Sequence, residues 1–170
     1  MSFAKGEETS PPQQSPQTNS ARVAEGTPPV TRTIAEWVVR SRLADIPPAV
    51  HAEAVRSVIN WIGVTIGGSR EEAVRRAIEA LSPYSGPGRS SVFGRSEKLD
   101  PLNAALVNGI SSHVLDYDDT HLATIIHPAG PIAAALFALS EDRHMTGAEF
   151  LHAFILGVEV ECRPPRGAGR

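Results

Sequence analysis

One short segment of the chain concentrates the side chains that could carry out acid–base chemistry. It reads DYDDTHLATIIH and carries Asp116, Asp118, Asp119, His121 and His127. Three carboxylates within four residues repel one another, so a fold keeps them where they are solvated, cap helices, pair with cations or take part in chemistry. Imidazole exchanges a proton near neutral pH. The segment therefore predicts a proton-transfer site, with ordinary helix-end and loop carboxylates as the alternative.

His127 is the histidine that the local sequence best places for such a site. Pro128 follows it and disfavours helical geometry at His127. An apolar helix is expected to begin after Pro128, which puts His127 near the positive end of that helix, where a substrate carboxylate could also bind. His121 fits a surface position as well as a site. Asp118 and Asp119 are equally well explained as capping or structural groups.

A metal centre is a second chemical interpretation of the same segment. Carboxylates and imidazoles are suitable ligands for several divalent metals. However, the spacing matches no metal motif, and the chain contains neither CxxC nor HExxH. We therefore expect no metal. Cys162 lies in an expected apolar helix without a base beside it, so it is not expected to be a nucleophile.

Composition limits the remaining classes of function. The chain has 170 residues, of which 41% are hydrophobic and 21% charged, with a formal net charge of -3, so one domain with a real core is expected. No basic run predicts nucleic-acid binding, and no apolar run approaches the roughly 20 residues of a membrane span. The single cysteine excludes an intramolecular disulfide, and the acidic N-terminal segment argues against a mitochondrial presequence. We expect a cytoplasmic protein.

Helical periodicity dominates the segments that must position the site. Helices are expected over residues 31–43, 48–66, 70–82, 101–115, 129–139 and 149–162, with only a short extended piece at SSVFG. Thr31 or Thr33 is expected to cap the first helix, Asp100 the fourth and Thr146 the last. Strands and helices do not alternate. The sequence therefore predicts an all-α, bundle-like domain or the helical half of something larger.

The fourth expected helix leads directly into the acidic segment. It is expected to bury one stripe of residues in the core, consisting of Leu102, Ala105, Leu106, Gly109, Ile110, His113 and Val114. On this interpretation His113 is a satisfied core histidine. The helix after Pro128 is apolar all round and is expected to be deeply buried.

The run from Asn103 to Pro131, NAALVNGISSHVLDYDDTHLATIIHPAGP, resembles the signature of the MmgE/PrpD family. The upstream INWIGVTIGG and the SSVFG…LDPLNAALVNG run are similar to the family's approach to that signature. The resemblance covers about residues 33–162. Asn60 stands where the family usually has an aspartate.

The resemblance implies a cofactor-independent lyase that acts on a small di- or tricarboxylate, as 2-methylcitrate dehydratase and cis-aconitate decarboxylase do. It implies that Asp116 orients or shares a proton, that Thr120 hydrogen-bonds a substrate carboxylate, and that His127 binds a carboxylate or assists proton transfer. His121 and Asp119 are implied to contact substrate. Dehydration, decarboxylation and epimerisation all stay open, and a homodimer is expected.

The expected organisation has three parts. Residues 1–29, rich in Ser, Pro, Gln and Thr, are expected to be a disordered leader. Residues 30–162 form the family-like helical domain, and residues 163–170 an irregular tail. Family chains continue into a second α+β domain, which is not expected here. The alternative function is therefore a truncated, non-catalytic helical fragment that acts as an interaction module or is an inactive product.

Overall fold

The computed structural model describes residues 29–163, so the expected leader and tail lie outside the described residues except for Pro29 and Arg163. The predicted all-α class is confirmed. The helices are α1 (Val30–Arg40), α2 (Pro48–Gly68), α3 (Glu72–Leu81), α4 (Pro101–His113), α5 (Ala129–Asp142) and α6 (Gly147–Cys162). Strands β1 (Ser90–Ser91) and β2 (Lys98–Leu99) form a small antiparallel pair, and 3₁₀ turns span Leu43–Asp45 and Ser82–Tyr84.

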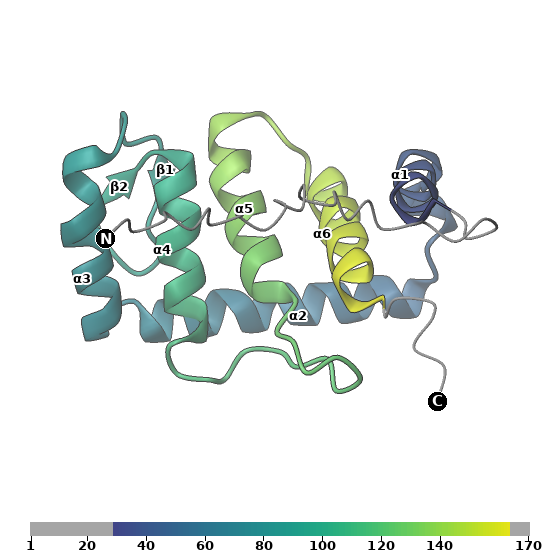
Figure 1. Cartoon of the computed structure of the whole chain (residues 1–170), viewed down its shortest axis with the longest axis horizontal. Coiled ribbons are helices and arrows are strands. Elements are labelled where there is room, and N and C mark those ends of the chain that lie inside the picture. The colour runs from purple at the N-terminus through teal and green to yellow at the C-terminus, as the bar shows by residue number, and fades with distance from the viewer. Residues whose placement is uncertain (1–28, 164–170) are drawn as a thin grey trace, which may run out of the picture.

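The helices are arranged as a row on a long crossing helix. Figure 1 shows α3, α4, α5 and α6 standing in sequence, with α2 running beneath the row. Each neighbouring pair in the row is in contact, and α2 touches α4, α5 and α6. The link from α4 to α5 passes on the α2 side of the row (Figure 1). Among the described helices, none is both long and apolar enough to cross a membrane.

Side-chain capping hydrogen bonds mark the starts of α4 and α6. Asp100 accepts hydrogen bonds from the backbone N–H groups of Leu102 and Asn103, and Thr146 forms a reciprocal capping box with Glu149. The prediction that Thr31 or Thr33 caps α1 is wrong. The helix begins one residue earlier because the carbonyl of Pro29 accepts the first helical hydrogen bond, and no side chain caps that end.

The core centres on Trp61 of α2, which is completely buried. Its ring stacks on Phe137 with centroids 5.2 Å apart and meets the edge of Phe93 at 5.4 Å. A second apolar cluster lies between α3, α4 and the strand pair, and consists of Val74, Ile78, Val92, Leu99, Ala104, Val107 and Ala138. These two clusters fix α4 and α5 relative to α2 and so position the link between them.

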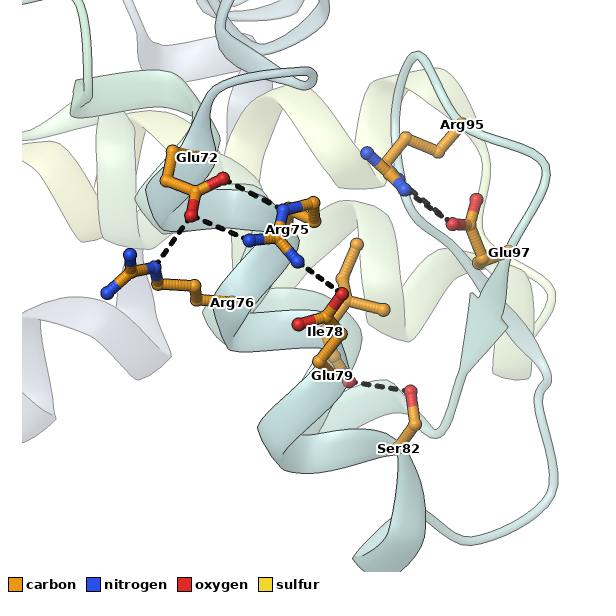
Figure 2. A network of polar contacts seen from close by, with 8 residues as sticks. All are labelled: Glu72, Arg75, Arg76, Ile78, Glu79, Ser82, Arg95 and Glu97. Atoms are coloured by element: carbon orange, nitrogen blue, oxygen red, sulfur yellow. Dashed lines mark hydrogen bonds and ion pairs between the residues drawn. The ribbon is translucent and has the colours of Figure 1, made fainter.

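The outer face of α3 is charged, as its sequence pattern predicts. Glu72 receives hydrogen bonds from Arg75 and Arg76, and Arg75 also pairs with Glu79 (Figure 2). The inner face of α3 buries Val74 and Ile78, whereas Ala73 is exposed.

The predicted orientation of α4 is wrong, and this is the largest correction to the fold. The buried residues of α4 are Ala104, Val107, Asn108, Ser111 and Ser112. The expected core stripe is instead exposed or half-buried, with 83% of Leu102 and 52% of Leu106 accessible to solvent.

Internal hydrogen bonds explain how α4 can bury its polar face. The side-chain amide of Asn108 donates to the Ser91 carbonyl and accepts from the Phe93 N–H, both at 2.9 Å. The hydroxyls of Ser111 and Ser112 donate to carbonyls of their own helix. Buried polar groups cost little when they are satisfied in this way. The expectation that α5 is deeply buried is wrong for one of its sides, where Pro131 and Ala135 are exposed. The fully buried residues of α5 are Ala129, Gly130, Ala133, Ala134 and Ala138.

Candidate active site

The link between α4 and α5, residues 114–128, carries the predicted chemical groups. Asp116 and Ile125 adopt positive φ angles of 56° and 53°. This left-handed conformation is tolerated by aspartate but is costly for a β-branched residue such as Ile125. A bridge between His121 and Ile126 closes the tip of the link. The loop therefore has a defined course that returns His127 to the end of α4.

A buried carboxylate lies between two imidazoles at this point. Asp118 has only 1% of its side chain exposed. One of its oxygens lies 3.0 Å from Nδ1 of His113, and the other lies 3.5 Å from Nδ1 of His127. The two imidazole rings are 4.8 Å apart between centroids. An ionised carboxylate only accepts hydrogen bonds, so this contact favours a proton on Nδ1 of His113.

The tautomer of His127 follows from a backbone contact. Its Nδ1 lies 2.8 Å from the carbonyl oxygen of Asp119. A peptide carbonyl can only accept, so Nδ1 must carry a proton and donate it. Nε2 is then left as the exchangeable nitrogen of the neutral ring. It lies 4.0 Å from Oδ1 of Asp116, and the Thr120 hydroxyl is 3.4 Å from Nδ1.

The two histidines sit at the polar end of a pocket between α4 and α5. The pocket has a volume of about 690 Å³. Its wall is mainly apolar and is formed by Ala105, Leu106, Gly109, Ile110, Val114, Gly130, Pro131 and Ala134, with His113, Asp118 and His127 as its polar lining. The stripe of α4 that was expected in the core is therefore a pocket wall. Such a shape, apolar with a few converging polar groups, is typical of a small-molecule site.

The structure brings some of the predicted site residues together and separates others. Asp116 and Thr120 lie beside His127, and both are exposed. His121 turns away, with Nδ1 2.7 Å from the Thr124 hydroxyl. His121 and Asp119 contribute to a second, smaller cavity between α2 and α6, which Thr120 also borders.

Asp119 has a role in the structure that links several elements. Its Oδ2 accepts a hydrogen bond from Ser57 of α2, and its Oδ1 accepts one from the backbone N–H of Ala129 at the start of α5. The side chain therefore caps α5 from a distance. Its backbone carbonyl, not its carboxylate, reaches His127.

Sequence reasoning misplaced His113 and gave Asp118 no specific role. The prediction that His113 is a core residue is wrong, because 58% of its side chain is exposed. The helix presents its small polar face to the core, so the apolar face with His113 turns outward. The sequence signal for this pair was the spacing of five residues between His113, in the last turn of α4, and Asp118 beyond the helix end. His113, Asp116, Asp118 and His127 also place potential ligand atoms within 4.8 Å of one another, which is close enough to hold a metal ion.

Comparison with known proteins assigns this arrangement to a family. Residues 32–169 match the MmgE/PrpD N-terminal domain. The chain belongs to the MmgE/PrpD family. The predicted resemblance is thereby confirmed over nearly all of the described residues.

Three curated relatives share this part of the family fold. A cis-aconitate decarboxylase of Mus musculus is 32% identical over 140 residues, 79% of this chain and 28% of the relative. Cis-aconitate decarboxylase of Homo sapiens is 31% identical over 140 residues, which cover 79% of this chain and 29% of the relative. A cis-aconitate decarboxylase-like protein of Aspergillus oryzae is 30% identical over 141 residues, 79% of this chain and 29% of that protein. The chain thus spans less than a third of the length of these MmgE/PrpD relatives.

Proposed function

We propose that the chain supplies the acid–base centre of a lyase that acts on a small di- or tricarboxylate, with decarboxylation of a cis-aconitate-type substrate as the first candidate. The observation that carries the proposal is the buried Asp118 between His113 and His127 at the end of an apolar pocket. The names of the relatives support decarboxylation ahead of dehydration or epimerisation. We also propose a cytoplasmic location and a homodimer.

The arrangement fits the proton transfers that decarboxylation needs. When CO₂ leaves, the carbon–carbon bond breaks and its electron pair stays on the substrate. A proton must then be added to a substrate carbon. The imidazolium form of His127 would provide it from Nε2, which leaves a neutral ring with its proton on Nδ1, the nitrogen engaged by the Asp119 carbonyl. In this proposal Asp116 orients Nε2, and the Thr120 hydroxyl donates to a substrate carboxylate.

The buried carboxylate would support this chemistry by stabilising positive charge. Protonation of either imidazole places a cation beside Asp118, which has little access to water. Ion pairs of low solvent exposure are screened less than surface pairs. His113 would then supply a second cationic or proton-donating group. None of these steps requires a metal or an organic cofactor.

The charge of the substrate sets a further requirement. The described residues that line the pocket include no lysine and no arginine. Two or three substrate carboxylates beside Asp116 and Asp118 would repel these aspartates unless cations balance them. Protonated His113 and His127 would balance part of this charge. We propose that a second copy of the chain, in the proposed homodimer, provides the rest.

Turnover by the purified chain tests the proposal. Cis-aconitate is incubated with the protein, and loss of substrate and release of CO₂ are followed together. We expect turnover that the change His127→Gln abolishes. His144→Gln is the matched control, because His144 is exposed in the link between α5 and α6. Turnover that is equal in both variants would exclude the site.

A non-catalytic helical interaction module is the second candidate function. It is favoured by the exposed apolar face of α4, where Leu102 and Leu106 are 83% and 52% accessible. Contiguous exposed apolar surface often marks an interaction site. A folded protein without turnover, whose self-association is weakened by Leu106→Glu, would support this function over the enzymatic one.

A further inference from the structure

Helix α2 carries a serine that contacts the link between α4 and α5. Ser57 is half-buried, and its hydroxyl donates to Oδ2 of Asp119 at 3.0 Å. The other carboxylate oxygen accepts the N–H of Ala129 at 3.1 Å. The Asp119 side chain is therefore held at both oxygens, by α2 on one side and by the first residue of α5 on the other.

This fixed residue is the one whose backbone controls His127. The carbonyl oxygen of Asp119 lies 2.8 Å from Nδ1 of His127. Because that carbonyl cannot donate, it favours a proton on Nδ1 of the neutral imidazole, as the more distant Asp118 Oδ1, 3.5 Å from the same nitrogen, also does. Ser57 is thus connected to His127 in three steps. Its hydroxyl binds the Asp119 side chain, covalent bonds join that side chain to the Asp119 carbonyl, and the carbonyl binds His127.

We propose that Ser57 is a positioning residue which, through Asp119, holds His127 in the Nδ1–H tautomer with Nε2 left for proton exchange. The inference deepens the proposed function, because the catalytic use of Nε2 rests on it. The tautomer itself is a property of the protein without substrate. It can therefore be tested whether or not the chain turns over a carboxylate.

A neighbouring contact supplies a matched control. Asn60 lies one helical turn beyond Ser57 on α2, and its side-chain amide donates to the Tyr117 carbonyl at 3.4 Å. This contact also ties the loop to α2, but it does not involve Asp119. General loosening of the loop would follow from loss of either contact, whereas loss of tautomer control should follow only from loss of the Ser57 contact.

The experiment reads the ring nitrogens of His127 directly. The full chain is prepared with ¹⁵N-labelled histidine, and proton–nitrogen spectra are recorded at about pH 8, where an ordinary imidazole is neutral. Protonated and unprotonated ring nitrogens differ widely in chemical shift. The His127 signals are assigned from the spectrum of His127→Gln. The same spectra are taken for Ser57→Ala, Ser57→Thr and Asn60→Ala.

We expect the Nδ1–H form of His127 to predominate in the parent protein and in Ser57→Thr, which keeps the hydroxyl. In Ser57→Ala the tautomer ratio should move toward Nε2–H by on the order of threefold to tenfold, the effect of losing one hydrogen bond. Asn60→Ala should leave the ratio unchanged. An unchanged ratio in Ser57→Ala, or an equal change in Asn60→Ala, would overturn the proposal.

A second variant covers the case in which Ser57→Ala does not fold. Asp119→Asn keeps the shape of the side chain but replaces one carboxylate oxygen by an NH₂ group. Either the Ser57 hydroxyl or the Ala129 N–H then loses its acceptor. It should shift the His127 tautomer in the same direction. If Asp119→Asn is folded and retains the parent ratio, the path from Ser57 through Asp119 is excluded.

Discussion

The carboxylate of Asp118 lies 3.0 Å from Nδ1 of His113, with the aspartate side chain 1% exposed and the histidine side chain 58% exposed. The Asp118 carboxylate is therefore inside the protein, and the His113 imidazole faces the pocket and solvent. This is the arrangement by which a fold can hold an imidazole in one orientation while it remains accessible to a ligand.

Replacing this carboxylate should impair the site without unfolding the protein. Asp118→Asn keeps the size of the side chain but removes the charge that stabilises a protonated imidazole. We expect kcat for cis-aconitate to fall by about 10²-fold or more, with only a small change in the thermal unfolding midpoint. Asp45→Asn, an exposed aspartate before α2, is the control. Full activity of Asp118→Asn would show that the buried carboxylate has no part in catalysis.

The contact between α2 and α4 should tolerate no side chain at Gly68. A Cβ there would collide with the backbone carbonyl of Ser111 and with Val114. Gly68→Ala should therefore destabilise the protein by about 1–3 kcal/mol, as overpacking does. Gly63 lies on the same helix with nothing within 4 Å of an added Cβ, so Gly63→Ala should stabilise by about 0.5–1 kcal/mol.

Urea unfolding of the two glycine variants measures both effects against the parent. The pair separates close helix packing from helix propensity, because the chemical change is the same at both positions. A Gly68→Ala protein that unfolds at the parent's urea concentration would show that α2 and α4 do not approach as closely as described.

The ionised Glu72 carboxylate should contribute to the free energy of unfolding, and this contribution should be lost at acidic pH. Hydrogen bonds from Arg75 and Arg76 lower its pKa from 4.5 to about 2 (Figure 2). Because the pKa is lower in the folded state, the contribution is present above the unfolded pKa and is lost as pH falls from about 4.5 toward 2. The effect is small because the pair is exposed.

Thermal unfolding between pH 6 and 2 checks this contribution. Glu72→Gln should be less stable than the parent near pH 6, and the difference should narrow as the medium becomes acidic. High salt should also narrow it, since surface ion pairs are screened. A difference that grows on acidification would contradict the assignment.

Cys162 should react slowly with alkylating reagents. Burial, with the nearby carboxylates of Glu161, Asp119 and Glu159, raises the pKa of the Cys162 thiol. The thiolate is the reactive form, so less of it is present at pH 8 than for an ordinary cysteine. The rate of iodoacetamide labelling should be several times lower in the folded protein than in urea. Equal rates would show that the thiol is neither buried nor surrounded by negative charge.

Features of the fold that depend on residues close together in the sequence could be predicted from it. The Asp100 cap and the Thr146 capping box were correct because the interacting groups lie within three residues. The family signature also identified Asp116 and Thr120, which the structure places beside His127. The functional roles of these residues stay predictions.

The face of α4 could not be predicted in the same way. Its apolar stripe and its small polar stripe have the same helical period, so periodicity favours burial of the apolar one. What reverses the choice is tertiary. Asn108 finds both of its partners in residues 91–93, about 16 positions earlier in the chain. The role of Ser57 depends equally on a contact across 62 residues with Asp119.

Titration with a non-reactive tricarboxylate tests the central claim most directly, namely that the pocket between α4 and α5 binds the substrate class. Propane-1,2,3-tricarboxylate is added to ¹⁵N-histidine-labelled protein at about pH 6, where imidazoles begin to be protonated. The account predicts saturable shifts of the ring signals of His113 and His127, with the signal of His144 unchanged. Unchanged signals of His113 and His127, or shifts equal to those of His144, would contradict it.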